Sequence, residues 1–200
     1  KKQTQVTDQT YIKLINYAKV CGNLQPKTPG SAPYYIWMVL EIAYLCRLRG
    51  IEVCNLTEDK ATEQGLICER TKGSRTNIAE WNPRLRAVWD LAIKKRDEIW
   101  KKQKRAIPLK PESRPLFVNI SGDPLKKSAV DSAWQRFIIR AIDDNIITKE
   151  ERFSPHDMKR KGATDTKGTR HEKQEATGHR SAAMMDVYDK SVSLVKPSGE

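Results

Sequence analysis

The sequence lacks long hydrophobic runs and paired cysteines, and each absence excludes a class of protein. It contains neither an apolar run of the roughly 18 to 20 residues needed to cross a bilayer nor an N-terminal signal peptide. The four cysteines form no CxxC pair, which argues against a zinc knuckle. Two of them, Cys46 and Cys54, lie in apolar, helix-like segments. We therefore expect a cytoplasmic protein without membrane contact, in which these two cysteines are reduced core residues.

Aromatic residues are also scarce, whereas positive charge is in excess. Phe, Trp and Tyr make up 7% of the chain and do not form the aromatic-rich platform on which single-stranded RNA stacks. Lysine and arginine outnumber aspartate and glutamate 37 to 25, which gives a formal net charge of +12. Such a surplus favours nucleic acid as a partner, because basic side chains displace its condensed counterions. The alternative is a basic protein with no nucleic-acid partner.

The length of the chain suits one domain. The 200 residues contain no internal repeat, and the 38% of hydrophobic residues falls in periodic segments, which is enough for one core. The chain starts at Lys1-Lys2-Gln3 and not at Met, as a fragment of a longer protein would.

The spacing of the apolar residues predicts mainly helices and one hairpin. Apolar residues at helical spacing predict helices over residues 7–18, 34–45, 49–57, 83–105 and 129–142. Residues 65–72 and 75–81 predict two strands joined by a tight turn at Gly73-Ser74. The basic residues 94–105 are typical of a solvated helix face and also suit contact with DNA. Residues 153–189 are poor in aliphatic side chains and rich in His, Lys, Arg, Gly and Thr, which suits either a site or a poorly packed surface.

The polar candidates have ordinary structural explanations when they are taken one at a time. Arg49 and Glu52 are three residues apart, as in a simple helical ion pair. Lys72 suits a solvated hairpin tip, residues 156–160 a charged helix start, and residues 178–181 a turn. Tyr188 suits a surface aromatic that anchors the C-terminus. The three histidines lack the helical spacing of metal ligands, so we expect neither a metal nor a cofactor.

In their order along the chain, however, these residues resemble the signature boxes of the tyrosine recombinase (phage integrase) family. The resemblance spans nearly the whole chain and rests on five boxes: Arg49 with Glu52, the hairpin lysine Lys72, the HxxR-like stretch from His156 to Lys159, the Gly178-His179 pair, and Tyr188 nine residues after His179. It implies an α+β, mostly α fold: a helical catalytic domain with a small antiparallel β-sheet.

The resemblance also implies roles in metal-free DNA cleavage. A tyrosine hydroxyl is mostly protonated at neutral pH and needs a base or a cationic neighbour before it attacks a phosphate. The implied roles are nucleophile for Tyr188, proton acceptor for His156, donors to the non-bridging phosphate oxygens for Arg49, Lys159 and His179, and proton donor to the leaving 5′-hydroxyl for Lys72. Arg160, Arg180 and Arg75 are expected to contact DNA.

One position departs from the family. Where relatives carry a second arginine, this sequence has Lys159. Lysine presents a point charge in place of a planar fork, so the bidentate grip on a phosphate is lost. Residues three and four beyond His156 flank one helix face, so either Lys159 or Arg160 can serve. We favour Lys159 because it keeps the family's spacing.

Domain organisation and partners follow from the same resemblance. Residues 1–188 are expected to form the catalytic domain and residues 189–200 a C-terminal tail, while the N-terminal core-binding domain of relatives is missing from this chain. The tail is either disordered or packs on a neighbouring protomer through its small apolar cluster. The implied partners are double-stranded DNA, further copies in a homotetramer, and in some integrases an accessory DNA-bending protein. With DNA as its partner, the protein is expected in the cytoplasm, associated with the nucleoid.

The conclusion at this stage is a site-specific recombinase, or integrase of a phage or mobile element, that cuts and rejoins DNA through a covalent 3′-phosphotyrosyl link. Two alternatives remain. One is a catalytically impaired relative that binds DNA without cutting it, for which Lys159 is the main support. The other is a type IB topoisomerase-like enzyme, which relaxes supercoils as a monomer. The short tail and the Arg-Gly-Ile-Glu box favour the recombinase.

Overall fold

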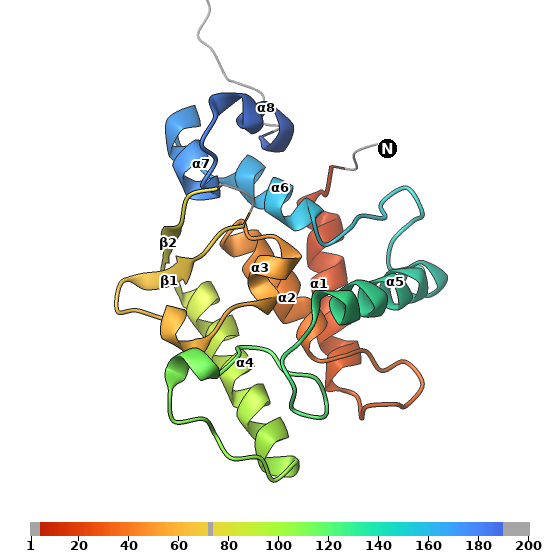
Figure 1. Cartoon of the computed structure of the whole chain (residues 1–200). Helices are drawn as coiled ribbons and strands as arrows, with labels where there is room; N and C mark the ends of the chain where they lie inside the picture. Colours follow the sequence, from red (N-terminus) through yellow and green to blue (C-terminus); the bar gives the residue numbers. More distant parts are fainter. Residues whose placement is uncertain (1–4, 72–73, 190–200) are drawn as a thin grey trace, which may run out of the picture.

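Helices surround the apolar helix α2, and a short antiparallel sheet lies at one side (Figure 1). The computed structural model describes residues 5–71 and 74–189. The elements, in chain order, are α1 (Asp8–Asn23), α2 (Tyr35–Leu45), α3 (Gly50–Cys54), η1 (Glu58–Lys60), β1 (Gly65–Cys68), β2 (Asn77–Glu80), α4 (Pro83–Lys102), η2 (Pro111–Ser113), α5 (Lys127–Asp143), α6 (Asp157–Asp165), α7 (Arg170–Thr177), η3 (Ala182–Met184) and α8 (Met185–Tyr188). This is the mostly helical α+β fold that the sequence predicts.

Local signals in the sequence explain where the long helices start. Thr7 caps α1, since its hydroxyl accepts a hydrogen bond from the backbone N–H of Thr10 at 3.1 Å. Asn82 caps α4 in the same way, at 2.7 Å from the N–H of Leu85, and Pro83 occupies the first turn. α2 carries apolar side chains on nearly every face and contacts α1, α3, α4, α5 and α6. Each fully buried aliphatic or aromatic side chain contributes roughly 1.5–3 kcal/mol, so α2 is the centre of the core.

The hairpin is shorter than the sequence predicts. β1 and β2 pair antiparallel only from Gly65 opposite Glu80 to Cys68 opposite Asn77, so the prediction of strands reaching residues 72 and 75 is wrong. Gly73 of the predicted Gly73-Ser74 turn lies outside the described residues, and the described residues between the strands are 69–71 and 74–76. The backbone N–H groups there have other acceptors: that of Thr71 donates to Glu52 and that of Arg75 to the carbonyl of Gly178. Contacts to distant segments have replaced the ladder.

The four cysteines are buried with free thiols, which confirms the reduced core residues expected at Cys46 and Cys54. Within residues 5–71 and 74–189, no helix is long and apolar enough to cross a membrane.

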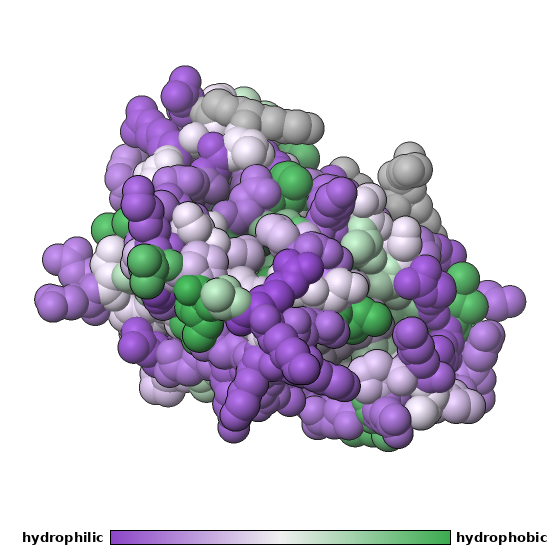
Figure 2. All heavy atoms as spheres, turned by 60° about the horizontal axis from the view of Figure 1, so that its bottom comes forward, coloured by the Kyte–Doolittle hydropathy of each residue, from purple (hydrophilic) through white to green (hydrophobic). Residues whose placement is uncertain are grey.

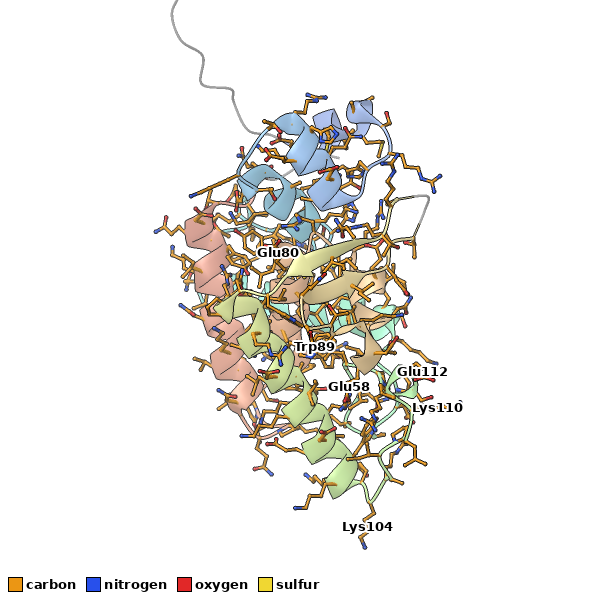
Figure 3. The ribbon with its side chains drawn as sticks, turned by 90° about the vertical axis from the view of Figure 1, so that its left-hand side faces the viewer. Glu58, Glu80, Trp89, Lys104, Lys110 and Glu112 are labelled. Atoms are coloured by element: carbon orange, nitrogen blue, oxygen red, sulfur yellow. The ribbon has the colours of Figure 1, made fainter. Side chains whose placement is uncertain are left out.

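The end of the molecule remote from α6–α8 is hydrophilic. Figure 2, which brings this end forward, shows a mostly hydrophilic surface with separate small hydrophobic groups. Lys104 lies at the far tip of α4, with Lys110 and Glu112 in the loop that follows (Figure 3). α6, α7 and α8 form a cap at the opposite end (Figure 1).

The cap is attached to the core through a close approach of α6 to α2 at Gly162. A Cβ at Gly162 would lie 2.3 Å from the carbonyl oxygen of Tyr44, too close for any side chain. We expect Gly162→Ala to lower the free energy of unfolding by about 1–3 kcal/mol, because the helices must move apart. Urea denaturation followed by circular dichroism measures the change.

Gly50→Ala is the matched control. Gly50 is also helical, and no heavy atom outside its own helix neighbourhood would lie within 4 Å of its Cβ among the described residues. Alanine there is expected to be neutral or stabilising by up to about 1 kcal/mol. Equal urea midpoints for the two variants would contradict the close packing of α6 on α2.

Candidate active site

Three segments of the chain bring polar side chains around the ring of Tyr188: Arg49 before α3, His156 and Lys159 at the start of α6, and His179 after α7. Tyr188, at the end of α8, is only 6% exposed. The ring centroid of His179 lies 4.5 Å from that of Tyr188, and the ring of His156 lies 6.1 Å away, edge-on. The Lys159 ammonium nitrogen lies 5.6 Å from the centre of the same ring. Five of the six residues predicted as catalytic, these four and Arg49, therefore gather in one place and come from one chain.

Arg49 is held in place by Glu52, one turn further on in α3. Glu52 accepts hydrogen bonds from the backbone N–H of Arg49 at 2.7 Å and from its guanidinium at 2.8 Å. It also accepts the N–H and hydroxyl of Thr71, which follows the hairpin strand. The predicted ion pair is thus present, and it also fixes the direction of Arg49. Burial lowers the pKa of Arg49, but Glu52 and the neighbouring Tyr188 outweigh this effect and raise it above its ordinary value.

Glu52 itself is buried as a carboxylate. Burial alone would raise its pKa, but the backbone N–H groups of Arg49 and Thr71 and the charge of Lys159 hold the pKa below its ordinary value. Glu52 is therefore a buried negative charge next to the positive side chains of Arg49 and Lys159.

Lys159 is the least accessible of these cations. Its side chain is fully buried, and its Nζ has no hydrogen-bond partner among the described residues. Burial, followed by repulsion from Arg70 and Arg49, lowers the pKa of Lys159 from 10.5 to about 7. Buried charged groups are normally paired, so an amine in this position is suited to an anion from outside the chain.

The two histidines of the site favour their neutral forms. Burial, and then the charges of Lys159, Arg49 and Arg70, lower the pKa of His179 to about 4. Its Nε2 is buried and likewise lacks a hydrogen-bond partner in the described part of the chain. Burial and the neighbouring Arg160 lower the pKa of His156. A neutral imidazole can both donate and accept a proton, which suits each ring to either role.

The remaining predicted residues are placed differently. Arg160 forms an ion pair with Asp157 at 2.9 Å. Arg75 and Arg180 are exposed near the hairpin connection and after α7, respectively. Lys72 and residues 190–200, which comprise nearly all of the predicted tail, lie outside the described residues. Among the described residues, no three His, Cys, Asp or Glu side chains are grouped to hold a metal ion.

Sequence reasoning missed a half-buried residue beside the site, Arg70. It lies in the segment predicted as strand, and nothing in its local sequence distinguishes it from a solvated arginine. Its partners are brought to it only by the fold, and they include the backbone carbonyls of Cys46, Arg47 and Ala176.

Comparison with known proteins decides the family. The profile of the phage integrase family matches residues 6–193, nearly the whole chain. The chain belongs to the phage integrase family. This membership confirms the resemblance predicted from the signature boxes. No curated protein sequence matches the chain.

Solved structures of integrases share the fold. The Tn1549 transposon integrase in complex with a circular intermediate DNA is similar with a TM-score of 0.76 and 13% identity, over 96% of this chain and 63% of that one. XerA recombinase gives 0.64 and 17%, over 96% and 62%. The lambda integrase catalytic core gives 0.61 and 14%, over 88% and 92%. The chain thus spans about two thirds of the longer structures and nearly all of the lambda catalytic core. At these identities the likeness shows the fold.

Proposed function

We propose that this chain is the catalytic domain of a site-specific DNA recombinase that cuts and rejoins DNA through a covalent link to Tyr188. One observation carries the proposal: two buried side-chain nitrogens, Lys159 Nζ and His179 Nε2, lack hydrogen-bond partners among the described residues and lie beside the Tyr188 ring. Donors of this kind stabilise an anion with little reorganisation. A scissile phosphate is the anion that places a reacting atom next to a tyrosine hydroxyl.

The proposed reaction needs no metal, because positive side chains replace it. The Tyr188 oxygen attacks phosphorus, the bond from phosphorus to the 5′ oxygen breaks, and a 3′-phosphotyrosyl ester forms. Arg49, Lys159 and His179 hold the non-bridging oxygens as negative charge builds. Neutral His156 takes the proton of the Tyr188 hydroxyl. By family resemblance Lys72 gives a proton to the leaving 5′-hydroxyl, and the reverse reaction rejoins strands without an external energy source.

The expected partner is double-stranded DNA, in agreement with the net charge of +12. The Tn1549 and lambda integrases have been solved bound to DNA. For this chain we propose DNA bound by a homotetramer, with an accessory DNA-bending protein as a further partner.

A covalent adduct tests the proposal directly. Nicked duplexes from the ends of the DNA element that encodes the chain trap the intermediate, because the released fragment diffuses away. We expect a protein–DNA band that resists SDS, and its complete loss in Tyr188→Phe with DNA binding retained. Denaturing gels and fluorescence anisotropy measure the two properties on the same samples.

Tyr17→Phe is the control, since the Tyr17 hydroxyl bonds to Asp144 between α1 and α5, away from the site. It is expected to form the adduct like the parent. DNA binding without an adduct in the parent would point to the impaired binder and overturn the proposal. Relaxation of a supercoiled plasmid at low protein concentration, with no joining of two sites, would indicate the topoisomerase-like alternative.

A further inference from the structure

Arg70 joins three distant parts of the chain behind the site. Its guanidinium donates to the carbonyl of Arg47 at 2.7 Å and to that of Cys46 at 3.0 Å, at the C-terminal end of α2. It also donates to the carbonyl of Ala176 at 3.0 Å, in the last turn of α7, and to the Asn77 side chain at the start of β2. One planar cation thus caps the ends of two helices, where partial negative charge accumulates.

The end of α7 receives further support from the same surroundings. The carbonyl of Ala176 also accepts from Arg47 Nε and from the Asn77 amide, each at 3.0 Å. The N–H of Arg75 donates to the carbonyl of Gly178 at 2.7 Å. The last turn of α7 is therefore tied to α2 and to both arms of the hairpin connection.

Gly178 connects the hydrogen-bonded end of α7 to His179. Gly178 ends α7 with a φ of +71°, a conformation that favours glycine. A Cβ there would lie 2.7 Å from Arg70 Nε and 2.4 Å from the carbonyl oxygen of Arg75. The next residue is His179, whose ring packs on that of Tyr188. The position of the imidazole is therefore set by how tightly the chain is held at Gly178.

We propose that Arg70 is a positioning residue: it fixes the C-terminal end of α7 against α2 and the hairpin, and thereby holds His179 beside Tyr188. The inference rests on the proposed function for its effect on cleavage, but its structural part stands apart from it. The two terminal nitrogens of the Arg70 guanidinium donate to acceptors within the chain. A displacement of a reacting group by about 1 Å can cost on the order of 10²-fold in rate.

The test compares Arg70→Gln with Arg114→Gln. Arg114 is a matched control, because it also donates to backbone carbonyls, those of Pro108 and Leu109, in the segment between α4 and α5. In Arg70→Gln we expect the single-turnover rate of adduct formation to fall about 10- to 100-fold, while the Kd for DNA changes less than about 3-fold. Arg70→Lys, which can reach one helix end but not both, is expected to give an intermediate rate. Arg114→Gln is expected to cleave like the parent.

A second measurement does not depend on cleavage. Nuclear Overhauser contacts between the His179 and Tyr188 rings are expected to weaken in Arg70→Gln and to persist in Arg114→Gln. Parental contacts and a parental rate in Arg70→Gln would overturn the inference. If the parent forms no adduct, the proposed function fails while the ring contacts still decide the role of Arg70. If Arg70→Gln does not fold, Gly178→Ala is measured in its place, because its Cβ would crowd Arg70 and the carbonyl of Arg75. Unchanged contacts between the His179 and Tyr188 rings in that variant would overturn the inference.

Discussion

Lys159→Met is expected to abolish cleavage and, at the same time, to make the protein more stable. The methionine side chain fits the volume of the lysine stem but cannot hold a phosphate oxygen, so adduct formation should fall by about 10²–10³-fold, as for the loss of one preorganised donor. The gain in stability follows from the buried amine, which is fully inaccessible and is repelled by Arg70 and Arg49. The fall of the pKa from 10.5 to about 7 corresponds, at 1.36 kcal/mol per pKa unit, to a cost of about 5 kcal/mol that the replacement removes.

The sign of the pH dependence makes this prediction specific. The pKa of Lys159 is about 7 in the folded protein and 10.5 ordinarily, so between these values the unfolded chain binds a proton that the folded chain does not. Stability of the parent therefore rises with pH across this window. The advantage of Lys159→Met should be largest at and below about pH 7 and should disappear toward pH 10.5. Urea denaturation at pH 6.5 and at pH 9 measures it.

Lys161→Met is the control from the same helix. Lys161 is also buried, at 6% exposed, but it is ion-paired with Asp165 and Asp8, which raise its pKa in spite of its burial. Its removal leaves two carboxylates without a cation and should lower stability at neutral pH. Two methionine variants, two residues apart, are thus expected to move stability in opposite directions. A destabilised Lys159→Met would show that the lysine is paired within the chain.

Glu52→Ala is expected to lower the free energy of unfolding more than the other variants do. Glu52 is 3% exposed and accepts hydrogen bonds from the backbone and side chain of both Arg49 and Thr71. Without it, Arg49 and Lys159 face each other with no anion between them. Removing one partner from a buried charge pair costs about 3–5 kcal/mol. The remaining folded protein should also cleave more slowly, because Arg49 loses its direction.

Glu58→Gln is the control that distinguishes a loss of stability from a loss of cleavage rate. Glu58 pairs with Arg96 of α4 and with Arg114. Its loss should lower stability without changing the rate of adduct formation per folded molecule.

Because the pKa of Glu52 is lowered from 4.5, the contribution of Glu52 to stability is present above pH 4.5 and is lost as the pH falls through the lowered value. A Glu52→Ala protein with the parental cleavage rate would show that Arg49 needs no orientation.

The sequence predicted the elements that depend on local signals and missed those that depend on distant partners. Thr7, Asn82 and the apolar stripe of α5 lie within the segments they organise, so the helices there were predicted correctly. The ends of the hairpin strands were wrong, because Thr71 and Arg75 take acceptors on α3 and after α7 that no window of sequence contains.

The site was predictable for a different reason. Order and spacing pointed to Arg49, His156, Lys159, His179 and Tyr188, and the fold places these five together. The choice of Lys159 over Arg160 rested on spacing alone and stays a prediction; the structure places the Lys159 ammonium by the Tyr188 ring and pairs Arg160 with Asp157. Arg70 was not predicted, because the carbonyls that it binds lie at the ends of α2 and α7, far from it in the sequence.

His179 and Tyr188 belong to one short stretch of chain, from the end of α7 through η3 to α8. Met185, which is fully buried, pins this stretch by contact with the Thr177 hydroxyl at 3.4 Å, and the Thr164 hydroxyl donates to the carbonyl of Tyr188 at 3.2 Å. A displacement of this stretch would therefore move the rings of His179 and Tyr188 together. Under the proposed function, the nucleophile and one of the groups that hold the phosphate would be displaced in a single step.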